Sequence, residues 1–104
     1  MFSSNLSPAE VERLALAAEE MGEAIQVIGK ILRHGYESKN PRDPFGPTNR
    51  GMLERELGDV RYAIQLLVER GEVRAGEVEE CRHAKVARVV PYLHHQQISG
   101  SEAR

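Results

Sequence analysis

Apolar residues recur at alternating steps of three and four over the first third of the chain. They fall at Val11, Leu14, Ala18, Met21, Ile25, Ile28 and Leu32. This spacing puts them on one face of an α-helix and is typical of the seam between paired helices. Ser7, Pro8 and Glu10 predict the start of that helix, as N-cap, first-turn proline and the partner in a capping box. We therefore expect a helix over residues 8–33 whose seam serves as core and which ends near Gly35.

The same spacing predicts a second helix over residues 49–70. Its apolar seam consists of Leu53, Leu57, Val60, Ile64 and Leu67. Either Thr48 or Asn49 is expected to cap its start, and Gly71 its end. The two helices would then be long neighbours joined by one connection.

That connection, residues 35–48, contains three prolines and two glycines, so it is predicted to be a loop. Long loops between helices are uncommon unless they have a role. Its aromatic residues, Tyr36 and Phe45, allow two interpretations. They either stack on a flat ligand or pin the loop to the helices.

A third helix is predicted from about Ala75 to Val90, which Pro91 ends. Its weaker apolar face consists of Val78, Cys81, Lys85, Val86 and Val89. Residues 92–104 lack periodicity and are expected to fray as a tail. The pattern as a whole predicts one all-α domain over residues 1–104, with its core over about 7–91. In this fold two long antiparallel helices and a shorter third form a bundle. A chain of 104 residues builds only a small core, which oligomerisation often supplements.

Composition removes several classes of function. The net charge is −2 and no block of basic residues occurs, which argues against a nucleic-acid binder. The single cysteine excludes an internal disulfide framework. Neither a basic-then-apolar leader nor an uninterrupted apolar run long enough to span a bilayer is found, so no membrane segment is expected. We expect a soluble cytoplasmic protein.

Each of the first two predicted helices carries a second stripe, offset from its seam, in the order apolar, acid, acid, apolar. The stripes are Leu16, Glu20, Glu23 and Val27 in the first helix, and Met52, Glu56, Asp59, Ala63 and Leu66 in the second. Acids three residues apart lie on one face of a helix. In a partly buried site these carboxylates would repel one another and raise each other's pKa, and a divalent cation would relieve that conflict.

The ligand types narrow the choice of metal. An all-oxygen set suits Mg²⁺, with Mn²⁺ as the alternative, better than zinc or copper. A di-iron bundle would place Glu-x-x-His on two helices, but here Glu23 and Asp59 hold the fourth positions. The competing interpretation is that the acids form solvated faces with ion pairs to Arg13, Arg55 or Arg61. One acidic pair alone would favour that view, whereas two matched pairs favour the metal.

Mg²⁺ held by carboxylates leaves positions for water and for substrate phosphates, so a phosphoanhydride is the expected target. Glu19 adjoins the acids and is expected to be either a further ligand or the base that orients water. Basic residues are expected to meet the phosphate charge, although each taken singly is more often ordinary surface charge. These are Lys30, Arg33 and His34 at the end of the first helix, and Lys85 and Arg88 on the third.

The two acidic motifs resemble a known family. Glu19-Glu20-Met21-Gly22-Glu23 followed by Glu56-Leu57-Gly58-Asp59 is similar to the Glu-Glu-x-x-Glu and Glu-x-x-Asp signature of the MazG-like all-α nucleoside triphosphate pyrophosphohydrolases. The resemblance covers about residues 10–70. It implies Mg²⁺ ligation by Glu20, Glu23, Glu56 and Asp59, and a homodimer or homotetramer in which helices of neighbouring subunits complete the bundle.

The resemblance also implies the reaction. A nucleoside triphosphate is cleaved between its α and β phosphates, giving a monophosphate and pyrophosphate, in nucleotide-pool housecleaning or control. It further implies that the third helix offers basic residues to the phosphates. The alternative function is a catalytically silent helical dimer that acts as a binding or regulatory module.

Overall fold

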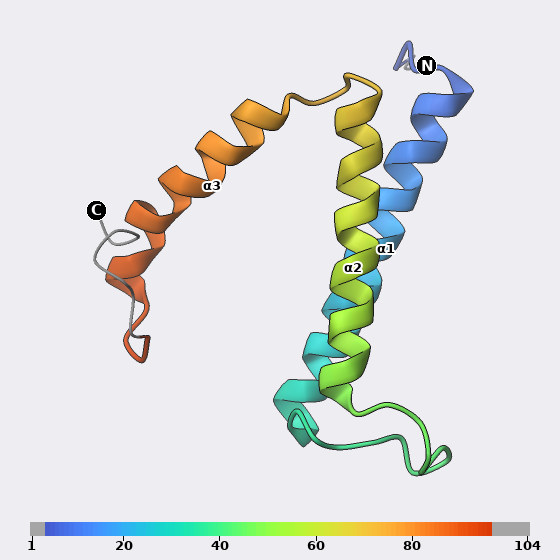
Figure 1. Ribbon diagram of the computed structural model, residues 1–104, viewed down its shortest axis with the longest axis vertical. Coiled ribbons are helices and arrows are strands. Elements are labelled where there is room, and N and C mark those ends of the chain that lie inside the picture. Colours follow the sequence, from blue (N-terminus) through green and yellow to red (C-terminus); the bar gives the residue numbers. More distant parts are fainter. Residues whose placement is uncertain (1–3, 97–104) are drawn as a thin grey trace. The chain divides into compact units, whose positions relative to one another are not determined.

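The computed structural model describes residues 4–96 and consists of helices joined by loops (Figure 1). The elements are α1 (Pro8–His34), α2 (Asn49–Glu69), α3 (Ala75–Val89) and a short 3₁₀ turn, η1 (Val90–Tyr92). Over residues 4–96 there is no β-strand, only an isolated antiparallel bridge between Lys39 and Thr48. The all-α class and the three predicted helices are confirmed, each to within one residue. From residue 97 on, the predicted tail lies outside the described residues.

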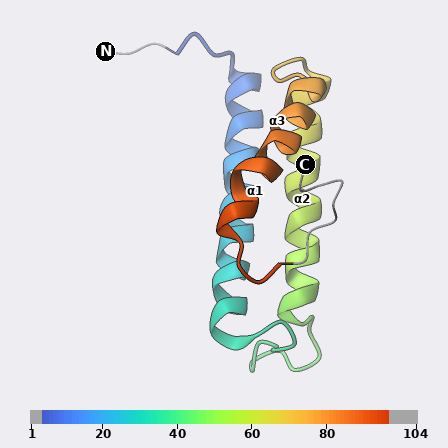
Figure 2. The same ribbon diagram turned by 90° about the vertical axis from the view of Figure 1, so that its left-hand side faces the viewer.

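The chain divides into two compact units, Met1–Glu69 and Arg70–Arg104. The first unit holds α1 and α2 and the loop between them, and the second holds α3 and η1. Within the first unit α1 and α2 run antiparallel and pack along each other (Figures 1 and 2). Across the described part of the chain, no helix is both long enough and apolar enough to cross a membrane.

The predicted capping of α1 is confirmed at its start. The backbone N–H of Ser7 donates to Oε1 of Glu10 at 2.8 Å, and Oγ of Ser7 accepts from the backbone N–H of Glu10 at 3.1 Å. At the other end, Gly35 has a φ of 87°, a conformation that favours glycine, and its N–H donates to the carbonyl of Ile31 at 2.7 Å. Local signals therefore fix both ends of α1.

The start of α2 also anchors the loop. Oγ1 of Thr48 accepts from the backbone N–H of Gly51 at 3.1 Å, so threonine is the cap. Asn49, only 6% exposed, donates from Nδ2 to the carbonyl of Gly35 at 3.1 Å and from its backbone N–H to Ser38 at 2.9 Å. Asn49 therefore joins the first helical turn of α2 to the beginning of the loop.

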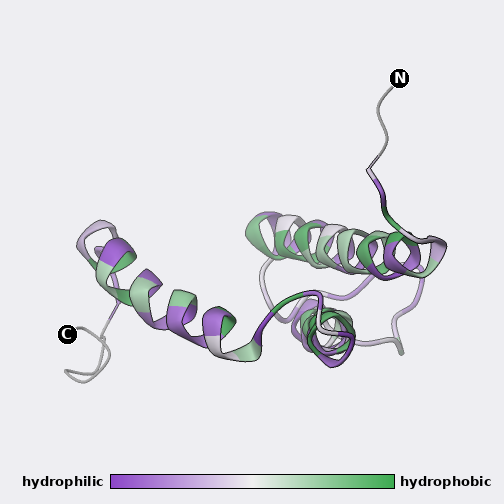
Figure 3. Ribbon diagram, turned by 90° about the horizontal axis from the view of Figure 1, so that it is seen from above, coloured by the Kyte–Doolittle hydropathy of each residue, from purple (hydrophilic) through white to green (hydrophobic). Residues whose placement is uncertain are grey.

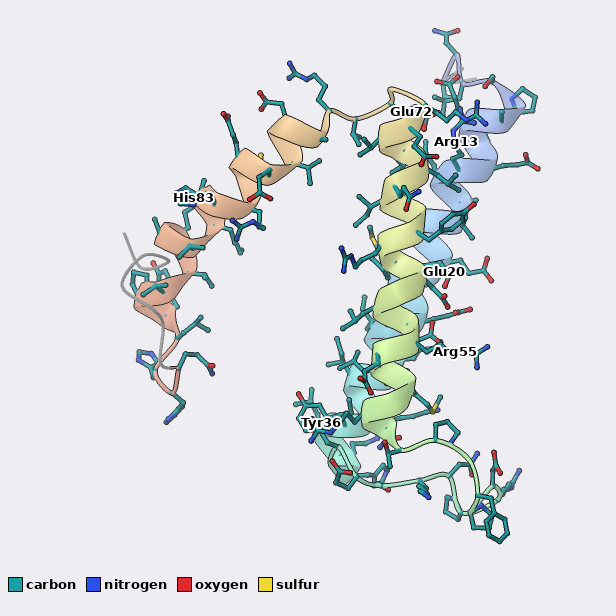
Figure 4. The ribbon with its side chains drawn as sticks, in the orientation of Figure 1. Arg13, Glu20, Tyr36, Arg55, Glu72 and His83 are labelled. Atoms are coloured by element: carbon teal, nitrogen blue, oxygen red, sulfur yellow. The ribbon has the colours of Figure 1, made fainter. Side chains whose placement is uncertain are left out.

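The two loop aromatics have different surroundings. The guanidinium of Arg50 lies 4.4 Å from the ring centroid of Tyr36, and Arg50 also forms an ion pair with Glu37 at 2.9 Å. Figure 4 shows Tyr36 at the loop end of α1. The prediction that an aromatic pins the loop is confirmed for Tyr36 and wrong for Phe45, which is 98% exposed. The stacking role of Phe45 on a flat ligand stays a prediction.

The face of α1 that packs against α2 differs from the one predicted. Ala17, Ala24, Val27 and Ala63 are the buried apolar residues of the described chain. The predicted seam of α1 lies outside this contact and is largely solvent-exposed, up to 83% at Leu32. Hydrophobic and hydrophilic residues alternate along the helices (Figure 3). The seam prediction is therefore wrong for the single chain, because small side chains on the acid-bearing face let the helices approach closely.

The other apolar faces are only partly covered. Most of the predicted seam of α2 is half-buried, whereas Leu57 remains 47% exposed. The third helix buries none of its side chains, and of its predicted apolar face Val86 and Val89 are half-buried while Val78 and Cys81 are exposed. No large side chain among the described residues is fully buried. The core of one chain is therefore small.

Candidate metal centre

The acidic stripes of α1 and α2 meet where these helices pack. Glu20, Glu23, Glu56 and Asp59 each offer one carboxylate oxygen, and these four oxygens lie within 4.8 Å of one another. Figure 4 shows Glu20 part-way along the paired helices, away from both ends. The sequence-predicted ligands are thus brought together.

Helical periodicity explains this placement. Glu20 lies seven residues before the buried Val27, and Glu56 lies midway between the buried Asn49 and Ala63, seven residues from each. Because seven residues make nearly two helical turns, each acid lies on the same line of its helix as the buried residues. Glu20 and Glu56 therefore lie on the packed faces of their helices.

Two of the carboxylates contain an oxygen that the protein leaves unsatisfied. Glu20, Glu23 and Glu56 are half-buried and Asp59 is exposed. Oε2 of Glu20 and Oε2 of Glu56 are both buried and have no hydrogen-bond partner. Buried polar atoms are nearly always paired because desolvation without a new hydrogen bond is costly. A cation bound between these two oxygens would supply the partner that each of them lacks.

The charges of the cluster act on one another. Burial raises the pKa of Glu20, and the negative charges of Glu23, Asp59 and the other nearby acids raise it further. Burial also raises the pKa of Glu56, the hydrogen bond and charge of Glu23 add to this, and Arg55 acts in the opposite direction. Burial and the neighbouring negative charges therefore make ionisation of Glu20 and Glu56 less favourable.

The donor set fits a hard divalent cation. All four groups are carboxylates, and neither histidine nor cysteine belongs to the cluster, which is the chemistry preferred by Mg²⁺ and Mn²⁺. The ion-pair alternative fits less well. The charge of Arg55 offsets only part of the rise in the pKa of Glu56, and Oε2 of Glu56 is buried without a hydrogen-bond partner.

Glu19 lies beside the cluster but outside the group of four. Its side chain is exposed, and its charge contributes to the raised pKa of Glu20. An exposed carboxylate next to the ligands is open to water and to substrate. Its role as base or as a further ligand stays a prediction.

The predicted phosphate-binding residues fall into two groups. Lys30, Arg33 and His34 line one cavity of about 380 Å³ at the loop end of α1. Lys85 and Arg88 are exposed residues of α3, in the second unit. Their approach to phosphates stays a prediction.

Lys39 lines the same cavity and was missed at the level of sequence. In the sequence, Lys39 is marked only by its positive charge in a polar loop, between Ser38 and Asn40. What brings it to the cavity is the attachment of the loop to the start of α2, which no local pattern encodes.

Comparison with protein-family models, curated proteins and solved structures found no match to this chain. The likeness to the MazG-like enzymes therefore depends on the two acidic motifs alone and stays a prediction. The geometry of the carboxylates stands independently of that likeness.

Proposed function

We propose that this chain is a Mg²⁺-dependent nucleoside triphosphate pyrophosphohydrolase that acts in nucleotide-pool housecleaning or control. The observation that carries the proposal is that four carboxylate oxygens lie within 4.8 Å of one another. Two of these carboxylates, Glu20 and Glu56, also have a buried oxygen without a hydrogen-bond partner. The order of the acids along two antiparallel helices, which resembles the MazG-like signature, supports this choice among phosphoanhydride hydrolases.

The acids have separate roles in this proposal. Glu20, Glu23, Glu56 and Asp59 would hold Mg²⁺, or Mn²⁺ in its place. When bound, the ion neutralises charge on phosphate oxygens and lowers the pKa of water. Glu19, exposed beside the cluster, accepts a proton from the attacking water. The water oxygen bonds to the α phosphorus, the bond to the bridging oxygen breaks, and pyrophosphate leaves.

Basic residues and a second copy of the chain complete the proposal. Lys30, Arg33 and His34 bind the phosphate oxygens and balance their charge. The large apolar residues left exposed on α1 support a homodimer or homotetramer in which neighbouring subunits complete the bundle.

The decisive experiment measures pyrophosphate released from a panel of canonical and modified nucleoside triphosphates in the presence of Mg²⁺. The double variant Glu56→Gln, Asp59→Asn should lose activity by about 100-fold or more, since removing even the partners of metal ligands costs about 10–100-fold. Glu12→Gln is the matched control, an acid-to-amide change at an exposed position of α1 outside the cluster, and it should retain activity.

Turnover by the wild type that is no greater than that of the double variant would defeat the proposal. The chain would then fit the alternative of a catalytically silent helical dimer. Calorimetric titration with Mg²⁺ and a nonhydrolysable nucleotide separates a failure of metal binding from a failure of catalysis.

A further inference from the structure

The cavity at the loop end of the α1–α2 pair is lined by cationic and neutral side chains, among them the apolar Pro41 and Met52. Its positive side chains are Lys30 and Arg33 from α1 and Lys39 from the loop, joined by the imidazole of His34. None of the described residues that line the cavity is acidic. Unbalanced cations held near one another repel, and an anion in the space between them removes that cost.

The backbone around this cavity is fixed by hydrogen bonds. Asn49 donates to the carbonyls of Gly35 and Ser38, and Lys39 forms an antiparallel bridge with Thr48. These contacts return the loop to the start of α2 and bring Lys39 to the same cavity as Lys30. Lys30 and Arg33 on α1 and Lys39 on the anchored loop therefore have backbones that are already positioned, which reduces the entropic cost of binding an anion.

The cavity and the carboxylate cluster follow the same lines of the two helices. Lys30 lies seven residues after Glu23 on α1, and Met52, which also lines the cavity, lies seven residues before Asp59 on α2. Seven residues correspond to nearly two turns and to about 10 Å of rise. The acidic cluster and the basic cavity therefore lie along one side of the helix pair, two turns apart.

We propose that this cavity is a pyrophosphate site, formed by Lys30, Arg33, His34 and Lys39, that holds two linked phosphate groups without a metal. Lysine and arginine donate charge-assisted hydrogen bonds to phosphate oxygens, and pyrophosphate presents more negative charge to several donors at once than a single phosphate does. A role for this site in catalysis rests on the proposed function: it would bind the terminal phosphates of the substrate or the released product. Pyrophosphate binding by the cavity does not depend on the proposed function. Lys39 becomes a phosphate-binding residue of the protein.

Calorimetric titration of the full chain with inorganic pyrophosphate in EDTA tests this site apart from any metal. One site per chain is expected, and Lys30→Gln, Lys39→Gln should weaken it by about tenfold or more, since hydrogen bonds to charged groups are lost. The matched control is Arg61→Gln, Arg70→Gln, which removes the same charge from exposed positions outside the cavity and should bind as the wild type does.

Absence of binding by the wild type, or equal weakening in both double variants, would overturn the proposal. Far-UV circular dichroism checks the fold of each variant. Displacement of pyrophosphate by a nonhydrolysable nucleoside triphosphate would identify the substrate's terminal phosphates as the natural occupant. Binding without such displacement would identify free pyrophosphate.

The variant Glu56→Gln, Asp59→Asn keeps this result distinct from the proposed activity. It should bind pyrophosphate in EDTA as well as the wild type does, because the cavity contains neither residue. Pyrophosphate binding in EDTA without hydrolysis of any nucleoside triphosphate would support the pyrophosphate site and refute the hydrolase. Hydrolysis of a nucleoside triphosphate without any pyrophosphate binding in EDTA would support the hydrolase and refute the pyrophosphate site.

Discussion

Glu20 of α1 and Glu56 of α2 place carboxylate oxygens within 4.8 Å of each other across the helix interface, and each keeps a buried Oε2 without a hydrogen-bond partner. Ala17 and Ala24, buried on α1, and Ala63, buried on α2, lie on the same packed faces. The fold therefore holds two half-buried acids where apolar side chains would pack better. Ionisable groups perturbed in this way cluster at binding sites, because stability is given up there for ligand recognition.

The double variant Glu20→Gln, Glu56→Gln should raise the melting temperature of the metal-free protein by a few degrees, because it removes two mutually repelling charges from the interface. In the wild type, Mg²⁺ should raise the melting temperature, since a ligand that binds only the folded state stabilises it. The variant should lose that response. Differential scanning calorimetry in EDTA and in Mg²⁺ measures both effects.

Glu12→Gln serves as the control for this pair, since it lies on α1 outside the cluster and should leave the response to Mg²⁺ intact. A wild type whose melting temperature is the same in EDTA and in saturating Mg²⁺ would contradict the metal centre.

The raised pKa values of Glu20 and Glu56 predict a pH dependence of stability. From the ordinary glutamate pKa of about 4.3 up through the raised values, the folded chain binds more protons than the unfolded chain. The free energy of unfolding contributed by these groups therefore falls as pH rises through that window. Urea unfolding in EDTA over a pH series should show the wild type losing stability relative to Glu20→Gln, Glu56→Gln. A difference between the two proteins that does not change with pH would refute this linkage.

The helices could be predicted from the sequence because their signals are local. The capping box of Ser7 and Glu10 and the glycine at position 35 fix α1, and both are observed as hydrogen bonds or as a positive φ. The four carboxylates were also predicted, because three-residue spacings place each acidic pair on one face of its own helix. The order of the two pairs, which resembles the MazG-like signature, gave the expectation that the two faces meet.

The packed face of α1 was not predictable in the same way. Periodicity shows two offset stripes on α1 and does not say which one meets α2. The seam with the larger side chains, such as Ile25 and Leu32, has the stronger apolar signal, yet the stripe containing Ala17 and Ala24 makes the contact. Closeness of approach, which depends on both helices together, decides between them.

The basic cavity depended on a contact that sequence patterns do not reveal. Asn49 hydrogen-bonds to Gly35, fourteen residues earlier, and this contact closes the loop. Nothing in the residues between them specifies the pairing. Lys39 could therefore not be placed beside Lys30 before the structure of the loop was known.

Replacing Asn49 tests how far this closure stabilises the first unit. Asn49→Ala removes the donor to the carbonyl of Gly35 in a buried position, so the free energy of unfolding should fall by about 1–3 kcal/mol. Asn40→Ala is the control, because Asn40 is exposed and accepts only a local bond from the backbone of Arg42. Urea unfolding should show a clearly smaller loss for the control. Equal losses would mean that the bond to Gly35 contributes nothing specific.

The exposed seam of α1 predicts self-association. Ile25 is 68% exposed and Leu32 is 83% exposed, an unusual state for large apolar side chains that share one helix face. Ile25→Glu, Leu32→Glu would bury two charges if a second copy covers this face, so the assembly should dissociate. Gln26→Glu adds a negative charge at the neighbouring exposed position, on a different side of the helix, and should leave the assembly intact.

Sedimentation equilibrium measures the outcome. The wild type and Gln26→Glu should sediment as a dimer or tetramer, and Ile25→Glu, Leu32→Glu should shift to smaller species with its helix content unchanged by circular dichroism. A wild type that is monomeric at all concentrations would show that the seam is not an interface between copies of the chain. An unchanged mass in the double variant would place the interface elsewhere. Because no large side chain within residues 4–96 is fully buried in one chain, the same measurement shows whether assembly supplies the missing core.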